Sequence, residues 1–378
     1  MKKFVKVMAT VAVLFTFVFG LVGCSKSSFK KGTIKIGVSG PLTGGAAAYG
    51  VAVANSAQLA VDEINAKGGY KGVKFSFVAL DDELQPTKAA ANYTSLYEKG
   101  MQVALGAVTS GAALEFGANA KTDSVFCLTP SATNDDVPKT GIYQMCFSDS
   151  GQGTAAATYV ATNYPSAKVG IFYDSSDDYS KGIYDNFKAQ YTGTTVDAAF
   201  TSDTKTDFNS QVQLLTECDF IFMPIYYSEA ALFIQQGKNV IKDNAVYFGC
   251  DGLDGIEGVE GFDPNAYTQE ISYLSHFNAA SEDQKVKDYV ANYKKAYKDG
   301  PLNQFGAAAY DCVYAIYEAL VASNADLNAD STAAEFYAAL NAQFSGNFSF
   351  SGITGTNITW NADRTVSKQP TKYVVNAK

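Results

Sequence analysis

The 378-residue sequence contains one histidine, His276, and this scarcity limits the chemistry open to the protein. Histidine is the side chain that enzymes use most often for proton transfer near neutral pH. His276 would have to supply every imidazole base and every imidazole metal ligand. It lies in the run YLSHFN, where a single histidine is typical of a structural or surface residue. No Ser-His-Asp triad can form without it.

The loops that bind nucleotides or activate a serine are also missing. Glycines at 37, 40, 44 and 45 follow the first predicted strand without the G-x-G-x-x-G spacing of a dinucleotide site. Neither G-x-x-x-x-G-K-[ST] nor G-x-S-x-G occurs. The acidic pairs Asp81-Asp82 and Asp177-Asp178 have the positions of solvated turn residues. We therefore expect neither enzymatic activity nor a cofactor.

Positive charge is scarce as well. The chain has 29 Lys and Arg against 38 Asp and Glu, a net charge of −9, and no long basic run. A phosphate backbone requires a basic surface, so the composition argues against a nucleic-acid partner.

The cysteines favour neither a metal site nor a full set of disulfides. Five follow Cys24, at positions 127, 146, 218, 250 and 312, and no C-x-x-C occurs. An odd number cannot all pair within the chain. Each of the five lies among apolar residues, which predicts buried free thiols. Disulfides between Cys127 and Cys146 or between Cys218 and Cys250 remain open if the strands that carry them are neighbours.

The N-terminus has the pattern of an export signal. A basic start, Met1 to Lys6, precedes the apolar run Val7 to Phe19, which is short for a membrane span. The run ends in Leu21-Val22-Gly23-Cys24, which resembles a bacterial lipobox. We expect residues 1–23 to be a signal peptide, Cys24 to be lipidated and 24–32 to be a tether, so that the protein is extracytoplasmic and membrane-anchored. The alternative is an ordinary secretory signal with an incidental cysteine.

Residues 33–69 predict the start of a parallel α/β sheet. The β-branched run 34–38 favours a buried strand, and a loop rich in Gly and Ala follows. Apolar residues then recur at helical spacing from Val53 to Ile64, and glycines end the helix. Strand, loop and helix form half of a βαβ unit, in which ligands bind beyond the carboxyl end of the strand.

The same alternation runs through most of the chain and predicts two lobes. Short apolar strands are predicted at 74–80, 103–108, 125–128, 143–147, 168–173, 197–200, 219–224 and 245–249. A polar, glycine-rich segment at 148–153 predicts a hinge between two parallel sheets covered by helices. Helices at 282–298 and 305–322 return to the first lobe, and 357–360 and 372–375 are predicted edge strands. The first lobe then comprises 33–148 and 275–356, and the second 149–274 and 357–378.

Hydrogen-bonding side chains follow several of these strands: Tyr49, Ser110, Thr133, Tyr179, Tyr226 and Asp251. Hydroxyls at helix N-termini suit a carboxylate, an aspartate suits an ammonium, and tyrosines offer apolar faces. Together they could hold a zwitterion between the lobes. The alternative is that the serine and threonine are helix caps and that some of the 24 tyrosines fall in loops by chance.

A family resemblance sharpens this interpretation. The segments IKIGVSGPLTGGAAAYG, DEINAKGG, GAVTSGAALEF, LTPSATND and SDSGQG, with Asp81-Asp82, resemble the Leu/Ile/Val-type substrate-binding proteins of ABC importers. The resemblance runs from about Thr33 to the C-terminus. It implies the type I periplasmic-binding fold, in which two Rossmann-like lobes are joined by a multi-strand hinge.

The resemblance also implies roles for site residues. Ser110 and Thr133 match positions that bind the ligand carboxylate, and the backbone of Ser131 matches one that faces the ammonium. In FGCDGLDG, Asp251 takes the place of the acid that receives the ammonium, which is commonly Glu in the family. Tyr49, Tyr179 and Tyr226 match aromatic positions.

The implied function is an amino-acid receptor that serves an ABC permease. The expected ligand is a neutral amino acid, and a branched-chain amino acid is one candidate. The open alternatives are an amide, urea-like or aromatic-acid ligand in the same fold, and a sensory or structural lipoprotein that transports nothing.

Overall fold

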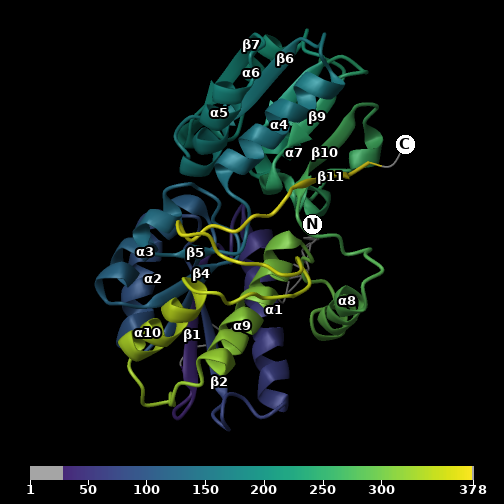
Figure 1. The fold of residues 1–378 in the computed structure, drawn as a ribbon. Coiled ribbons are helices and arrows are strands. Elements are labelled where there is room, and N and C mark those ends of the chain that lie inside the picture. Colours follow the sequence, from purple (N-terminus) through teal and green to yellow (C-terminus); the bar gives the residue numbers. More distant parts are fainter. Residues whose placement is uncertain (1–28, 377–378) are drawn as a thin grey trace, which may run out of the picture.

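The computed structural model describes residues 29–376. The predicted signal peptide, the lipidation site at Cys24 and residues 25–28 of the tether lie outside the described residues. The described chain contains two β-sheets, each covered by helices, and its segments cross repeatedly between them (Figure 1). The predicted two-lobed α/β architecture is confirmed.

The first sheet is parallel, in the order β2-β1-β3-β4-β5. Its strands are β1 (Ile34–Gly40), β2 (Phe75–Asp81), β3 (Val103–Ala107), β4 (Phe126–Thr129) and β5 (Tyr143–Gln144). Both faces are covered, which explains why these strands are nearly continuous apolar runs. The strand order reverses between β1 and β3, and a crevice is expected at their carboxyl ends.

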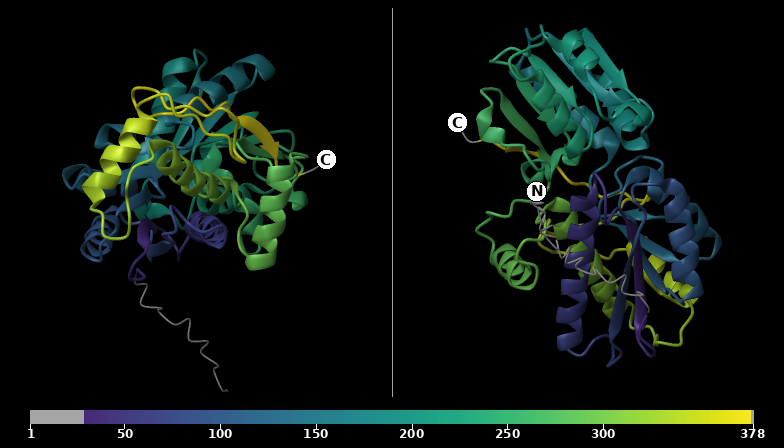
Figure 2. Two further views of the ribbon diagram at one scale, coloured as in Figure 1. Left: turned by 60° about the horizontal axis from the view of Figure 1, so that its bottom comes forward. Right: turned by 180° about the vertical axis from the view of Figure 1, so that it is seen from behind.

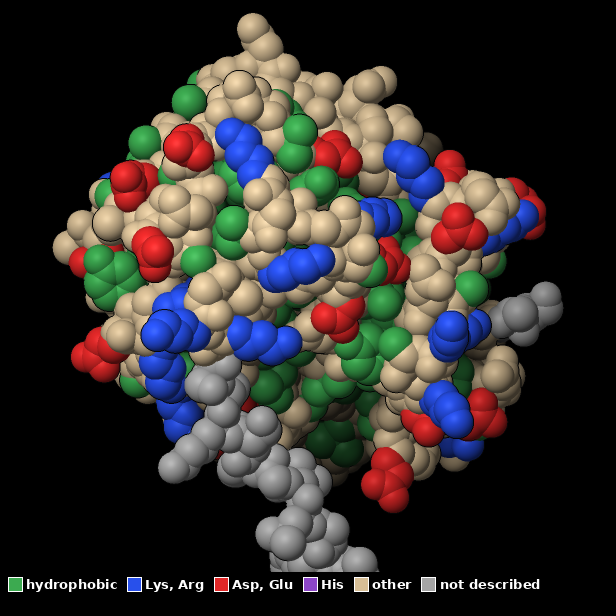
Figure 3. All heavy atoms as spheres, turned by 90° about the horizontal axis from the view of Figure 1, so that it is seen from below, with side chains coloured by type: hydrophobic (Ala, Val, Ile, Leu, Met, Phe, Trp, Pro, Cys, Tyr) green, Lys and Arg blue, Asp and Glu red, His purple; other side chains and the backbone are tan. Residues whose placement is uncertain are grey.

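Helices from two separate parts of the sequence cover this sheet. One face packs against α1 (Ala47–Ala66), α9 (Gln304–Ser323) and α10 (Ala333–Phe344), and the other against α2 (Pro86–Glu98) and α3 (Ser110–Thr122). Helix α8 (Gln284–Ala296) lies beside α1. We call this sheet and these helices the first lobe. On the surface of the first lobe that faces away from the second lobe, acidic and basic side chains are mixed (Figure 3).

The second lobe is built around a sheet of order β11-β10-β9-β8-β6-β7. Its strands are β6 (Val169–Asp174), β7 (Thr195–Phe200), β8 (Phe220–Met223), β9 (Val246–Gly249), β10 (Glu270–Ser275) and β11 (Thr371–Val374). All neighbours are parallel except β11, an antiparallel edge strand. The helices of this lobe are α4 (Asp149–Asn163), α5 (Asp178–Gln190), α6 (Asn209–Leu215) and α7 (Tyr227–Gly237).

Short 3₁₀ turns complete the chain. They are η1 (Val137–Thr140), η2 (Ser202–Thr204), η3 (Asp251–Leu253), η4 (Ile256–Gly258) and η5 (Pro264–Ala266). The chain passes between the lobes after β5, after β10 and before β11, and the two further views show these crossings from other sides (Figure 2).

Two local expectations differ from the structure. The segment 148–153, expected to be a hinge, forms the start of α4, where Ser148 Oγ accepts a hydrogen bond from Gly151 N and caps the helix. The expected strand at 357–360 is reduced to isolated pairings of Ile358 and Trp360. Helix α10 was not among the predicted elements.

The last crossing also begins later than the expected boundary at residue 357. Trp360 packs against Phe344 of α10, with ring centroids 4.3 Å apart, and its indole N–H donates to the Gln144 carbonyl at 2.8 Å. Both partners belong to the first lobe. The apolar indole and its single polar group are both satisfied there, which holds residues 358–360 on the first lobe.

All five cysteines after Cys24 are buried and free. The expectation of free thiols is confirmed, and neither open disulfide is formed. Within residues 29–376, no helix combines the length and the apolar character that a membrane crossing requires.

Candidate ligand-binding site

The carboxyl ends of the strands meet at a small cavity between the lobes. The first lobe contributes Tyr49, Val108, Thr109, Ser110, Ser131 and Phe305, and the second contributes Tyr179, Tyr226, Asp251 and Gly252. Six of the seven residues predicted to bind ligand therefore lie together. The cavity measures about 20 Å³, close to the space that one water molecule occupies.

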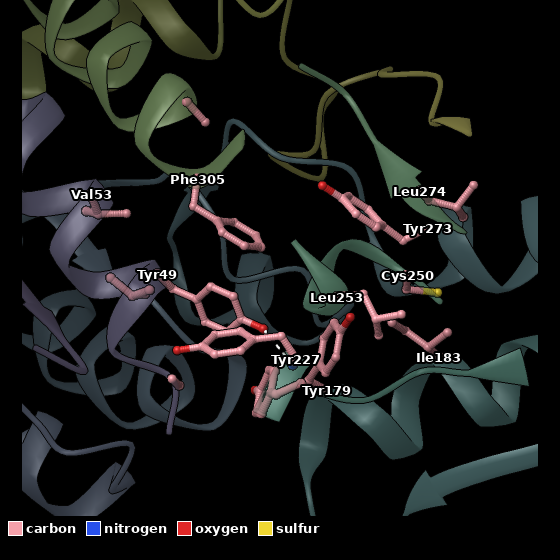
Figure 4. Packing of buried hydrophobic residues seen from close by; sticks show 14 of the residues in the cluster. Tyr49, Val53, Tyr179, Ile183, Tyr227, Cys250, Leu253, Tyr273, Leu274 and Phe305 are labelled. Carbon is pink, nitrogen blue, oxygen red and sulfur yellow. Dashed lines mark hydrogen bonds between the residues drawn. The ribbon is translucent and has the colours of Figure 1, made fainter. Parts of the chain in front are cut away.

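Tyr49 forms the centre of an aromatic cluster at this cavity (Figure 4). It lies in the first turn of α1, and its ring makes edge contacts with Tyr227 and Phe305 at centroid distances of 5.0 and 4.7 Å. The next residue is Gly50, where a Cβ would lie 2.1 Å from the Pro41 carbonyl oxygen. The loop can therefore turn tightly into α1, and Tyr49 faces the second lobe.

The first lobe presents hydroxyls and helix N–H groups. Ser110 is the first residue of α3, directly after the Thr109 cap, and its Oγ accepts only a long hydrogen bond from Asn134 N at 3.3 Å. The free N–H groups and dipole of a helix N-terminus favour an anion. Ser131 Oγ donates to the Val108 carbonyl at 2.6 Å, which fixes this side chain against β3. This edge of the cavity is suited to a carboxylate.

The second lobe presents a carboxylate without a cation. Asp251 is 1% exposed and begins η3 directly after β9. It accepts a hydrogen bond from Tyr179 Oη at 2.7 Å, while its own backbone N–H donates to Gln152 Oε1 at 2.9 Å. No Lys or Arg of the described chain forms an ion pair with it. Burial raises its pKa to about 7, and the Tyr179 hydrogen bond offsets only part of this shift.

The aromatic wall of the second lobe is rigidly placed. The rings of Tyr179 and Tyr226 stack at 5.0 Å with an interplanar angle of 8°. Burial raises the pKa of both phenols well above the usual value, so both stay neutral. The Tyr179 hydroxyl also accepts from Gly252 N at 2.8 Å, which ties α5 to η3.

Thr133 lies behind the residues that line the cavity and not, as predicted, on the cavity surface. It is fully buried, does not line the cavity, and its Oγ1 has no hydrogen-bond partner. Gln144 Nε2 donates to the carbonyls of Ala132 and Asn134, which draws this segment toward β5. The Thr133 hydroxyl lies near the Asp149 carboxylate, whose pKa is raised by burial.

Sequence reasoning missed Val108, Thr109, Gly252, Phe305 and, behind Asp251, Gln152. Thr109 and Gly252 adjoin predicted residues, so the strand ends already indicated them. Phe305 lies in the first turn of α9, more than 250 residues after Tyr49, and no local signal places it in the cavity.

A larger groove in the first lobe is a weaker candidate. It has a volume of about 590 Å³ and lies between α1, α8 and α9. One of its acids, Glu63, already accepts hydrogen bonds from Tyr310, Tyr314 and Asn292. The carboxylate therefore has no shortage of donors, unlike Asp251.

Hydrogen bonds between the lobes show that the cavity is closed. Tyr49 Oη donates to the Gly252 carbonyl, Ala48 N donates to Tyr227 Oη at 3.1 Å, and Asn134 Nδ2 donates to the Asp178 carbonyl at 2.9 Å. An amino acid is larger than the enclosed space. A ligand of that size can enter and fit only if the lobes separate and the rings around it rearrange.

Comparison with known proteins identifies the family. The family model described as periplasmic binding protein matches residues 33–377. The chain belongs to this family. The Leu/Ile/Val-binding protein BraC3 of Rhizobium johnstonii is 35% identical over 229 residues, which are 58% of this chain and 62% of BraC3. The Leu/Ile/Val-binding protein of Escherichia coli is 25% identical over 83% of this chain and 86% of its own.

Solved structures agree with the fold. The substrate-binding protein LivJ of Streptococcus pneumoniae, in complex with isoleucine, is 31% identical with a TM-score of 0.78, covering 91% of this chain and 96% of its own. A solute-binding protein of R. palustris in complex with benzoate has a TM-score of 0.76 at 22% identity, covering 92% and 94%. The latter shows the fold alone.

Proposed function

We propose that this periplasmic binding protein is an extracytoplasmic receptor that binds a neutral amino acid between its lobes and delivers it to an ABC importer. The observation that carries the proposal is the buried carboxylate of Asp251, which has no cationic partner among residues 29–376 and lies across the cavity from the N-terminus of α3. An ionised acid in such a place is costly unless a cation pairs with it. A zwitterion supplies an ammonium for the acid and a carboxylate for the helix.

In the proposed binding mode, the ammonium meets Asp251 and the Ser131 carbonyl. The carboxylate meets the Ser110 hydroxyl and the first N–H groups of α3. Thr133, in the layer behind, supports this edge and comes into reach of the ligand if the segment moves. Tyr49, Tyr179 and Tyr226 enclose the side chain, and their apolar faces favour an aliphatic group. Relatives named for binding Leu, Ile and Val support this class of ligand.

Binding is coupled to closure of the lobes. The contacts of Tyr49 with Gly252 and of Ala48 with Tyr227 exist only when the lobes meet. A ligand that contacts both lobes stabilises this closed state and shifts the hinge equilibrium toward it. The importer can then distinguish the loaded receptor by its shape. We propose no catalytic role, because the site contains no nucleophile paired with a base.

The proposal includes a lipid anchor at Cys24, based on the Leu-Val-Gly-Cys sequence. The test is the Cys24→Ser variant expressed in a bacterium that processes lipoproteins. The parent should sediment with membranes and the variant should be released or remain unprocessed. Equal distribution of the two proteins, with both processed to the same size, would refute the anchor.

A thermal-shift screen tests the ligand class. The purified protein is unfolded and refolded to remove bound ligand, then screened against the twenty amino acids and a panel of amides and aromatic acids. Ligand at a hundred times its Kd should add roughly 2.7 kcal/mol of stability. A shift with aliphatic amino acids supports the proposal. A shift only with aromatic acids, which the stacked Tyr179 and Tyr226 rings could also accommodate, would replace the amino acid as ligand.

The Asp251→Ala variant tests the binding mode. It should weaken amino-acid binding by about 3–5 kcal/mol, because the ligand ammonium would be buried without a partner. Unchanged affinity would show that the ammonium lies elsewhere.

A further inference from the structure

A second polar groove lies at the hinge, away from the cavity just described. It measures about 240 Å³ and lies between residues 354–359 and residues 367–369, against the end of β10. These segments lead into the last crossing between the lobes. His276 and Lys368 line the groove together with hydroxyl side chains from both segments.

Lys368 lines the groove with hydrogen-bonding capacity to spare. Its ammonium donates to Thr354 Oγ1 at 2.7 Å, and no carboxylate of the described residues lies within ion-pair distance. Asp311 lies behind Thr354, but this carboxylate already accepts hydrogen bonds from Ile353 N, Thr354 N and Thr354 Oγ1. An ammonium has three donors, so two of them remain for a ligand. Burial lowers its pKa to about 8.

His276 is unusual because neither ring nitrogen has a hydrogen-bond partner. Both nitrogens are shielded from solvent, and the ring makes an edge contact with Phe147 at a centroid distance of 5.1 Å. Buried polar atoms are nearly always hydrogen-bonded, and leaving one without a partner costs stability. The ring of His276 therefore has an unused hydrogen-bond donor and acceptor in the described structure.

Lys368 is the charged residue that lines the groove, and the Asp311 carboxylate acts on it only from behind Thr354. None of the residues that line the groove is acidic, although acids outnumber bases in the chain as a whole. Thr356, Thr359 and Ser367 add hydroxyl donors around Lys368 and His276. Ammonium, imidazole N–H and hydroxyl groups are the donors that carboxylates and phosphates accept from.

We infer that this hinge groove binds a small oxyanion, a carboxylate or a phosphate, through Lys368, and that the His276 ring in the wall of the groove turns to donate an N–H to it. The volume accommodates such a group with part of its hydration shell. The bound anion would connect the end of β10 to residues 354–369, two parts of the hinge that come from separate stretches of sequence. This site is independent of the amino-acid cavity and does not rest on the proposed function.

The single histidine provides a specific probe. The purified protein, without a histidine tag and with ¹⁵N-labelled histidine, is titrated with inorganic phosphate and separately with acetate at constant sodium chloride. We expect the His276 ring resonances to shift to saturation with at least one of the two anions, and the anion that saturates identifies the preferred chemistry. Saturation by neither would overturn the inference.

Matched variants assign the effect to the groove. Lys368→Gln should weaken the saturable binding at least tenfold. Lys372→Gln, which removes an ammonium that instead pairs with Glu270 at 2.7 Å, should leave it within twofold. The same binding curve for the parent and Lys368→Gln would refute the site. If Lys368→Gln does not fold, Lys368→Met and His276→Phe can be compared by the phosphate-induced shift in Tm, which the parent should show and both variants should lose.

Discussion

Tyr179 donates a hydrogen bond from its hydroxyl to Asp251 Oδ1 at 2.7 Å, and both residues are buried at the inner edge of the second lobe. The same hydroxyl accepts from Gly252 N. Tyr179 therefore fixes the direction of the carboxylate before a ligand arrives. Pre-orientation of this kind reduces the ordering that binding would otherwise require.

Removal of this hydroxyl should weaken ligand binding. In Tyr179→Phe the stacked ring remains, but Asp251 loses a donor that favours its ionised form. A hydrogen bond to a charged group contributes about 1.5–3 kcal/mol, so we expect the Kd of the amino acid at pH 7 to rise by roughly ten- to a hundredfold. Isothermal titration calorimetry measures the change.

Tyr184→Phe is the matched control for that variant. Tyr184 lies on the same helix, and its hydroxyl donates to Asp197 Oδ2 at 2.9 Å at the surface. Its loss should leave the Kd within about twofold. If both variants bind equally well, Tyr179 does not position Asp251.

Affinity should depend on pH through Asp251. Burial raises the pKa of this carboxyl to about 7 in the unliganded protein, and only the ionised form pairs with an ammonium. The Kd should be constant well above pH 7 and rise as pH falls through 7, by about tenfold per unit at the lower end. Titrations between pH 5 and 8.5 check this, because the amino acid itself stays zwitterionic in most of that range.

The Asp251→Asn variant supplies the control for the pH profile. It should bind weakly at every pH, with no inflection near 7. A parent protein whose Kd does not change between pH 5 and 8 would show that Asp251 is already ionised or does not contact the ammonium.

The inter-lobe hydrogen bond of Tyr49 should favour closure. Tyr49 Oη donates to the Gly252 carbonyl on the opposite lobe, and Tyr49→Phe removes this bond without emptying the aromatic cluster. A hydrogen bond contributes about 0.5–1.5 kcal/mol, so a two- to tenfold shift toward the open form is expected. Small-angle X-ray scattering of the unliganded variant should give a larger radius of gyration than the parent.

Tyr70→Phe tests whether that effect is specific to the interface. Tyr70 Oη donates to the Ala325 carbonyl within the first lobe. The variant should lose a similar amount of stability and keep the parent's radius of gyration. Equal expansion of both variants would contradict a closing role for Tyr49.

The buried thiols should be unreactive in the folded protein. All five described cysteines are buried, and burial raises the pKa of each thiol. Since the thiolate is the reactive form, a thiol reagent should label these cysteines only at the rate of unfolding, and all five after denaturation. Rapid labelling of any of these five in the native protein, or fewer than five of them reactive after denaturation without reductant, would contradict the free buried thiols.

Much of the fold was predictable because local and global signals agree. The strands Val103–Ala107 and Phe220–Met223 are apolar and buried on both faces, and Ile34–Gly40 is buried apart from Lys35, as a covered parallel sheet requires. The sequence also contains a pattern that indicates the start of helix α10. Thr332 and Glu335 form a capping box in which each side chain bonds the other's backbone N–H.

Other features depend on contacts that no local pattern contains. The glycine-rich start of α4 packs closely on α5, where a Cβ at Gly153 would lie 2.8 Å from Phe187 N, and this approach is not contained in the local sequence. Thr133 follows a strand like Ser110 does, yet a turn held by Gln144 places it behind the cavity. The position of Trp360 on the first lobe likewise depends on Phe344, a tertiary contact.

The central claim is that the ligand is held by its ammonium as well as by its carboxylate. The most direct test is a calorimetric comparison of the amino acid that gives the largest thermal shift with the 2-hydroxy acid of the same side chain. The account predicts that the hydroxy acid binds at least about a hundredfold more weakly, because Asp251 would face a group that carries no positive charge. Affinities within about threefold of each other would contradict it.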